Sequence, residues 1–135
     1  MRIIVESKIG APLDQVWQAY TTPHDIVQWN AASDDWHTTR AHVNLVVGGE
    51  FSSRMEAKDG SVGFDFAGVY TNIIPQQLLE YRFGERTASV EFHQTDDGVL
   101  VKVAFDPEDT FSLEQQQGGW QAILNNFKRY VESFE

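Results

Sequence analysis

The last part of the chain carries apolar side chains at steps of three and four residues, which is the spacing of one helix face. Gln117 is the one polar position in this stripe. The apolar members are Leu113, Trp120, Leu124, Phe127, Val131 and Phe134. The stripe predicts an amphipathic helix of about six turns.

A glycine pair, Gly118 and Gly119, lies inside this predicted helix. A glycine in a helix interior costs up to about 1 kcal/mol relative to alanine, so the pair predicts a close approach to a sheet or a bend. We expect residues 113–117 to form a movable rim and residues 120–134 to be anchored. The entrance of any pocket would then lie beside residues 113–117.

Before this helix, the period of the pattern is two, which is typical of strands. The alternation predicts a first strand over residues 3–9 and six further strands between Trp36 and Phe105. Asp59-Gly60 and Asp97-Gly98 are strong signals for tight hairpins. Because tight hairpins join antiparallel neighbours, the strands are expected to form an antiparallel meander.

Two short helices are predicted between the first strand and the second. Pro12 and Pro23 stand where a helix tolerates proline, at its first positions. The first helix would turn inward the side chains of Leu13, Val16, Trp17 and Tyr20. The second would run toward Trp29 with Thr22 as its N-cap. The predicted order is strand, two helices, six strands and a long helix, an α+β fold.

Composition restricts the partners and the compartment. The chain has 135 residues, which predicts a single domain over residues 1–135. Its formal net charge is −10, which disfavours nucleic acid and anionic membrane surfaces as partners. The sequence has no cysteine, no segment typical of a signal peptide and no apolar run long enough to insert in a membrane. We therefore expect a cytoplasmic protein.

The chain offers few candidates for catalysis. The four histidines are spread over different predicted elements, and the paired carboxylates fall in predicted turns, so we predict no catalytic residue, no metal site and no cofactor. Glu50, Arg54, Glu56 and Asp65 alternate with aromatic residues and are expected on the outer face of the sheet. A register slip of one residue would turn them inward, where they would be candidate catalytic groups.

Several segments together resemble a known family. They are Ala11-Pro12 with Val16-Trp17, Thr22-Pro23 with Trp29, Gly48-Gly49-Glu50-Phe51, Gly68-Val69-Tyr70 with Ile74-Pro75, and Gly119-Trp120 with Leu124 and Phe127. In this order and spacing, they resemble the START-like (Bet v 1-like, SRPBCC) superfamily, in the branch related to the activator of Hsp90 ATPase.

The resemblance implies a helix-grip fold, in which a curved seven-stranded antiparallel sheet wraps around the long C-terminal helix. It also implies a possible hollow between the sheet and that helix. Members of the superfamily bind hydrophobic small molecules, act as cyclases or hydrolases, sequester toxic compounds under stress, or regulate a chaperone. Fold alone does not choose among these functions.

The aromatic residues of the strands are the candidate binding site. We expect an apolar cavity whose polar contacts come from Tyr70, Tyr81 and Gln117, with open space left by Gly68. The predicted ligand-binding residues are Trp29, Trp36, Phe51, Met55, Phe64, Phe66, Tyr70, Tyr81, Phe83, Phe92, Gln117, Trp120 and Leu124. Large aromatic side chains could equally fill this space as an ordinary core.

Three functions are compatible with these features. The first is binding of a hydrophobic small molecule. The second is a co-chaperone-like module that binds a chaperone or another protein through its acidic surface, as a monomer or a homodimer. The third is an enzyme of the cyclase or hydrolase type, which would need ionisable groups inside the cavity.

Overall fold

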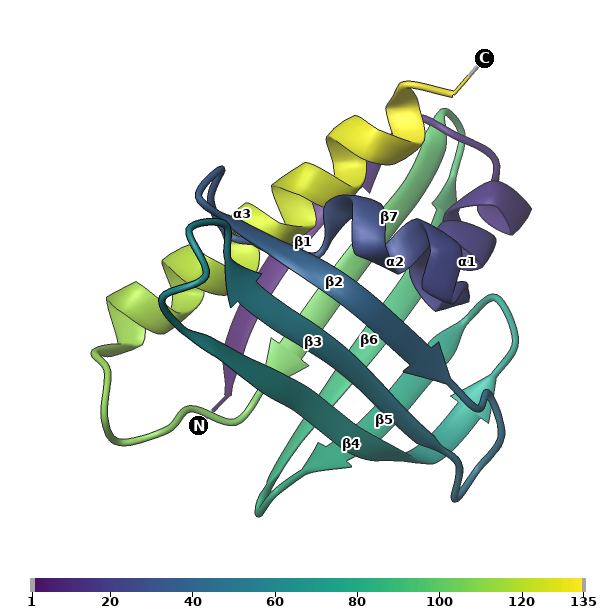
Figure 1. The fold of residues 1–135 in the computed structure, drawn as a ribbon. Coiled ribbons are helices and arrows are strands. Elements are labelled where there is room, and N and C mark those ends of the chain that lie inside the picture. The colour runs from purple at the N-terminus through teal and green to yellow at the C-terminus, as the bar shows by residue number, and fades with distance from the viewer. Residues whose placement is uncertain (1, 135) are drawn as a thin grey trace.

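The computed structural model describes residues 2–134 and confirms the α+β helix-grip fold (Figure 1). The elements are β1 (Ile3–Ile9), α1 (Leu13–Thr21), α2 (Pro23–Trp29), β2 (Trp36–Val43), β3 (Glu50–Ala57), β4 (Gly63–Ile74), β5 (Leu78–Phe83), β6 (Arg86–Thr95), β7 (Gly98–Phe105) and α3 (Leu113–Glu132). This is the order that the hydrophobic pattern predicts.

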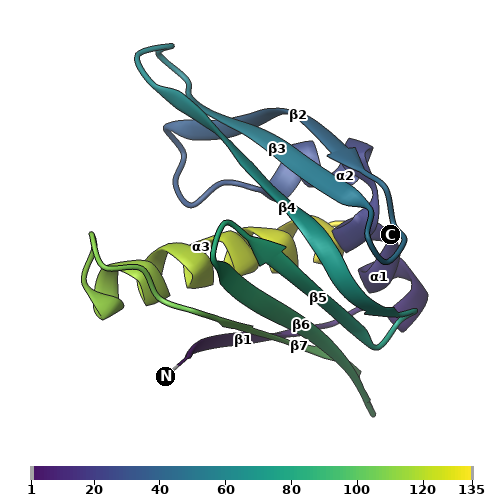
Figure 2. The same cartoon turned by 90° about the horizontal axis from the view of Figure 1, so that it is seen from below.

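All seven strands form one antiparallel sheet in the order β1-β7-β6-β5-β4-β3-β2. The first strand therefore pairs with the last, with Ile3 opposite Phe105. The sheet curves around α3, as the view in Figure 2 shows, with β2, β3 and β4 on one side of the helix and β1 and β7 on the other. Register shifts after Thr38 and after Tyr70 mark irregularities of the kind that bend a strand.

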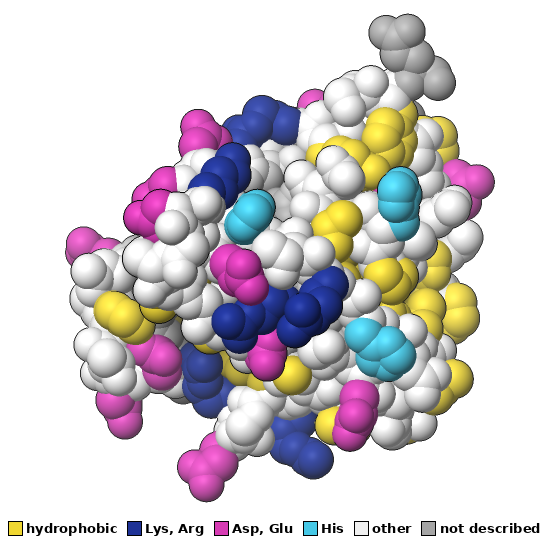
Figure 3. All heavy atoms as spheres, in the orientation of Figure 1, with side chains coloured by type: hydrophobic (Ala, Val, Ile, Leu, Met, Phe, Trp, Pro, Cys, Tyr) yellow, Lys and Arg dark blue, Asp and Glu magenta, His cyan; other side chains and the backbone are white. Residues whose placement is uncertain are grey.

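The inner face of the sheet is the one that the alternation predicts. In β3, Ser53, Met55 and Ala57 are buried. On the outer face, the Arg54 side chain forms ion pairs with Glu56 at 2.9 Å and with Asp65 at 3.5 Å. The alternative register, with these charges turned inward, is therefore wrong. Figure 3 shows acidic and basic side chains next to one another on this face, with no continuous patch of either sign.

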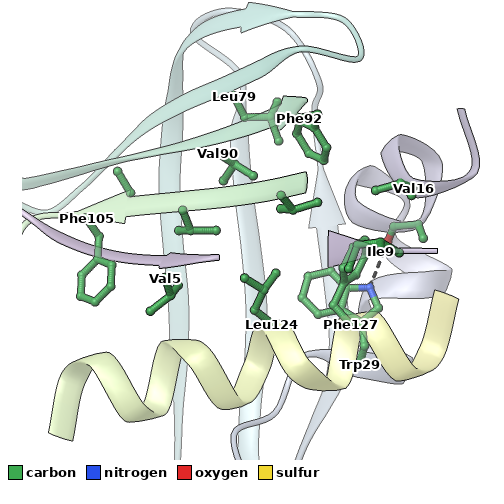
Figure 4. Packing of buried hydrophobic residues seen from close by; sticks show 14 of the residues in the cluster. Val5, Ile9, Val16, Trp29, Leu79, Val90, Phe92, Phe105, Leu124 and Phe127 are labelled. Carbon is green, nitrogen blue, oxygen red and sulfur yellow. Dashed lines mark hydrogen bonds between the residues drawn. The ribbon is translucent and has the colours of Figure 1, made fainter. Parts of the chain in front are cut away.

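The core lies where α3, α1 and α2 meet the strands (Figure 4). Phe127 of α3 has no exposed surface, and its ring contacts Trp29 with ring centroids 4.9 Å apart. The Trp29 indole N–H donates a hydrogen bond of 3.0 Å to the carbonyl oxygen of Ala19, which ties α2 to α1. The two short helices are thus fixed against the C-terminal half of α3.

Helix α3 differs from its prediction in two ways. It runs without interruption through Gly118 and Gly119, and apart from the helix's own backbone no atom of residues 2–134 lies within 4 Å of where a side chain would begin at either residue. The predicted close approach of these glycines to the sheet is therefore wrong. The apolar stripe is also shorter than predicted, because Leu113 and Phe134 are 45% and 40% exposed.

The start of α3 is capped by Ser112. Its hydroxyl accepts a hydrogen bond from the Gln115 backbone N–H, and the Gln115 side chain accepts one from the Ser112 backbone N–H. This reciprocal pair satisfies two donors that a helix start leaves free. No helix within residues 2–134 is both long and apolar enough to cross a membrane.

Candidate functional site

A cavity of about 620 Å³ lies between α3 and the curved sheet. The aromatic rows of β3, β4 and β5 form its wall opposite α3, and α1 and α2 contribute to one end. The predicted site residues that line it are Trp29, Trp36, Phe51, Met55, Phe64, Phe66, Tyr70, Tyr81, Trp120 and Leu124. These side chains therefore leave open space between α3 and the sheet.

The aromatic rings of the walls brace one another. Trp120 stacks on Phe105 with ring centroids 3.9 Å apart and planes at 10°, and it meets Phe66 edge-on at 6.2 Å. Phe51 contacts both Tyr70 and Tyr81, at 5.1 and 4.9 Å. Such contacts hold the walls in place, because each ring limits the movement of its neighbours.

Three predicted site residues do not line the cavity. Phe83 is 6% exposed and lies under the Arg86 guanidinium, whose central carbon is 4.5 Å from the ring centroid. Phe92 is 4% exposed and packs against Trp17 and Tyr20. Both point inward as core residues, and neither lines the cavity.

Gln117, the third, lies on the exposed face of α3, where its amide is 3.5 Å from the carbonyl oxygen of Ile4. The buried glutamine is its neighbour Gln116, which is 8% exposed. One helix position corresponds to about 100° of rotation. The stripe therefore predicts the helix correctly but assigns the wrong side of its first turn to the cavity. Leu113, the first member of the stripe, is exposed and does not lie on the inner face.

Gln116 joins α3 to the segment that follows β7. Its Oε1 accepts a hydrogen bond of 2.8 Å from the Glu108 backbone N–H. Its Nε2 donates to the carbonyl oxygens of Glu108, at 3.0 Å, and Phe111, at 2.9 Å. Residues 113–117, predicted to be a movable rim, are thus tied to the cavity wall through this side chain.

The predicted gap at Gly68 is also wrong. A side chain there would begin 2.5 Å from the carbonyl oxygen of Arg82 and 2.8 Å from the ring of Phe51, so the position is filled by its neighbours. Gly119 is the glycine that leaves room, because it lines the cavity and, apart from the helix's own backbone, no atom of residues 2–134 lies within 4 Å of the point where its side chain would begin. Helical spacing places Gly118, by contrast, on the exposed side.

Sequence reasoning missed several polar residues of the cavity wall, and four of them matter for its chemistry. Tyr20 comes from α1, Arg86 begins β6, and Glu108 and Gln116 lie near the start of α3. The nearest approach between Arg86 and Glu108 joins Nη2 and Oε2, at 3.9 Å. Glu108 Oε1 is buried without a hydrogen-bond partner among residues 2–134. Arg86 and Glu108 are far apart in the sequence, and no local pattern predicts that they meet.

Burial dominates the electrostatics of the tyrosines in the wall. It raises the pKa of Tyr70 to about 12 and the pKa of Tyr81 well above its ordinary value. Burial also raises the pKa of Tyr20, with a further contribution from the nearby Tyr70. At neutral pH, all three phenol groups therefore remain protonated and can donate hydrogen bonds.

The backbone of Tyr70 is held by the loop between β2 and β3. Its N–H donates to the carbonyl oxygen of Gly49 at 2.9 Å, and its carbonyl oxygen accepts from the N–H of Gly48 at 2.8 Å. Gly48 has φ +85°, and a side chain at Gly49 would begin 2.1 Å from the carbonyl oxygen of Asn44. The glycine pair of the sequence motif is thus required by this tight loop.

A second hollow, of about 390 Å³, adjoins the cavity at Trp29 and Trp36. Two of its polar groups are paired within the protein: the Asn126 amide donates to the carbonyl oxygen of Ala31, and the Tyr130 hydroxyl donates to Asp25. Within residues 2–134, no cluster of three or more histidine, aspartate or glutamate side chains is placed to hold a metal ion.

Comparison with protein families shows to which family the chain belongs. The model of the family described as Activator of Hsp90 ATPase homolog 1-like protein matches residues 10–132. The chain belongs to this family. No curated protein matches it.

Solved structures agree with this AHSA1-like assignment. The solution structure of the AHSA1-like protein from Aeromonas hydrophila has 46% identity and a TM-score of 0.93, over 98% of this chain and 93% of that one. A protein from Cytophaga hutchinsonii has 43% identity and a TM-score of 0.84, over 98% and 92%. A protein from Chromobacterium violaceum, with 20% identity and a TM-score of 0.87 over 98% of both chains, shares the fold.

Proposed function

We propose that this AHSA1-like protein binds an apolar small molecule between α3 and the sheet. The observation that carries the proposal is the cavity of about 620 Å³, whose walls are mainly aromatic and aliphatic with a few polar groups. Small-molecule sites usually have this composition and a volume of about 300–1,000 Å³. The braced rings favour a preformed site, which avoids the cost of ordering the walls on binding.

The proposal is tested with phenylnaphthylamine, an uncharged dye whose fluorescence rises in apolar surroundings. We expect saturable binding with one dye per chain. Gly119→Leu would place a side chain in the cavity and should weaken binding at least about tenfold, because the dye and the leucine compete for the same space.

Gly118→Leu is the matched control. It makes the same change one residue earlier, on the exposed side of α3, and should leave dye binding unchanged. Urea unfolding of both variants checks that they remain folded. A folded wild-type protein that binds no dye would refute the proposal, as would equal loss of binding in the two variants.

A second candidate is a protein-interaction module that acts on a chaperone. The description of the family and the net charge of −10 favour it, because an acidic surface promotes association with a basic partner. The test is binding to purified Hsp90 at low and high salt. Association that weakens as salt rises would support this function, and no association at low salt would refute it.

The enzymatic alternative requires ionisable groups in the cavity, and Arg86, Glu108 and His42 do line it. His42 is exposed on β2, so it belongs to the rim. Arg86 and Glu108 face each other as an ion pair. No arrangement among these three groups favours a particular reaction, so the binding function is the one that we develop.

A further inference from the structure

Three tyrosines from separate elements meet around the cavity. Tyr70 of β4 and Tyr81 of β5 are directly opposite each other in the strand register, and both rings contact Phe51. Cross-strand partners on one face lie side by side. Tyr20 reaches the same cavity from α1, where its ring packs against Phe127 at 5.1 Å.

The hydroxyl groups of these tyrosines have no hydrogen-bond partner in the part of the protein that the structure describes. No hydrogen bond among residues 2–134 involves the hydroxyl of Tyr20, Tyr70 or Tyr81, whereas the Tyr130 hydroxyl donates to Asp25. They are not sealed off either, because Glu108 Oε1 is the sole buried side-chain polar atom without a partner in that part of the chain. The three hydroxyls are therefore accessible from the cavity, and a bound molecule can pair with them.

The surrounding packing fixes these groups. The Tyr70 backbone is hydrogen-bonded to Gly48 and Gly49, and Tyr70 and Tyr81 are only 6% and 7% exposed. Tyr20 is held between the rings of Trp29, Phe92 and Phe127. Donors that are already oriented lose little entropy on binding, so such a set is suited to recognising one polar group.

The charges nearby favour an uncharged ligand. Inside the rim, the charged side chains that line the cavity are Arg86 and Glu108, and their charges offset each other across 3.9 Å. A carboxylate or an ammonium would exchange water for a largely apolar wall whose two charged side chains together carry no net charge, and this exchange carries a large desolvation penalty. A carbonyl oxygen, in contrast, is neutral and can accept two hydrogen bonds.

We propose that Tyr20, Tyr70 and Tyr81 form the polar recognition point of the cavity, and that the ligand is an uncharged, largely apolar molecule with a carbonyl group. This inference rests on the proposed ligand-binding function. It assigns the polar contacts to three tyrosines, including Tyr20, and it specifies the chemical class of the ligand: a ketone, ester or amide with an apolar body.

The test compares two probes of nearly identical shape. One is benzophenone. The other is the hydrocarbon in which a methylene group replaces its carbonyl group. Each is titrated against the protein saturated with phenylnaphthylamine, and dye displacement gives the affinity. We expect benzophenone to bind at least about tenfold more tightly, since hydrogen bonds from two of the hydroxyls favour the ketone alone. Diphenylacetate, an anion of similar size, should bind more weakly than benzophenone.

Substitution of each tyrosine by phenylalanine locates the effect. Tyr70→Phe, Tyr81→Phe and Tyr20→Phe keep the ring and remove only a hydroxyl that has no hydrogen-bond partner within residues 2–134, so the variants should fold. The preference for benzophenone should fall several-fold in at least two of them. Tyr130→Phe is the matched control, because its hydroxyl pairs with Asp25 away from this cavity, and it should keep the full preference.

Infrared spectroscopy supplies a readout that a purely structural role would not change. The carbonyl stretch of bound benzophenone should lie at lower frequency in the wild-type protein than in the phenylalanine variants, because hydrogen bonding weakens the C=O bond. Equal affinities for ketone and hydrocarbon in a protein that binds the dye would overturn this inference alone. Absence of dye binding would overturn the proposed function itself.

Discussion

The attachment of Gln116 gives the sharpest test of how α3 is oriented. Gln116 and Gln117 are neighbours in the same helix turn, yet the first is 8% exposed and the second is exposed. We therefore compare Gln116→Ala with Gln117→Ala. Because both changes replace glutamine by alanine in the same helix turn, differences in helix propensity cancel to first order.

The expected magnitudes follow from the hydrogen bonds of each side chain. Gln116 makes three of good length, two with Glu108 and one with Phe111, at 2.8, 3.0 and 2.9 Å. A net value of about 1 kcal/mol for each predicts a loss of about 2–3 kcal/mol, since water can replace part of the pairing near the surface. Gln117 makes one contact of 3.5 Å, so its loss should be below about 0.5 kcal/mol.

Urea unfolding followed by circular dichroism measures both free energies of unfolding. The midpoint of the Gln116→Ala variant should fall while its denaturant slope stays that of the wild-type protein. A loss below about 0.5 kcal/mol for Gln116→Ala, or equal losses for both variants, would refute the assignment of the buried face of α3.

The remaining predictions concern α3 and the tyrosines. Gly118→Ala should raise the free energy of unfolding by up to about 1 kcal/mol in urea, because apart from the helix's own backbone no atom of residues 2–134 lies within 4 Å of the added methyl group; a destabilisation would contradict these open surroundings. Trp120→Ala should cost about 3 kcal/mol in the same assay, through loss of the stack on Phe105, and a loss under about 1 kcal/mol would contradict that packing. In alkali, the unfolded chain loses phenol protons near the ordinary pKa of 10.0, before Tyr70 does at about 12, so stability should fall as the pH rises through this window. The absorbance of phenolate measures the ionisation of the tyrosines in the folded protein. Full ionisation of Tyr70 in the folded protein at about pH 10 would contradict its raised pKa.

Local patterns predict the order of the elements, whereas the curved sheet around the C-terminal helix is implied by the resemblance to the START-like superfamily. The alternation of apolar residues predicts the inner face of the strands, and Asp59-Gly60 and Asp97-Gly98 predict two of the turns. Each of these signals depends on residues near one another in the sequence. The outward direction of Arg54 and Asp65 follows from the same alternation, since strands turn successive side chains to opposite faces.

The site is predicted less completely because it depends on tertiary distances. The sequence does not show that the ring of Phe51 covers Gly68, nor that Tyr20 of a helix reaches the cavity beside Tyr81 of a strand. The choice of Gln117 over Gln116 fails because the stripe extends to the exposed Leu113. A short apolar stripe fixes the rotation of a helix only where its members are buried.

The pairing of the first strand with the last has a consequence for how the chain acquires its structure. Ile3 pairs with Phe105, so β1 can join the sheet only after β7 has been synthesised. Pairings between such distant segments slow folding, since a long loop closes before the contact forms. During translation, the apolar residues of β1 remain without a partner until β7 leaves the ribosome. We therefore expect the N-terminal segment to be the part of the nascent chain that most needs protection from aggregation.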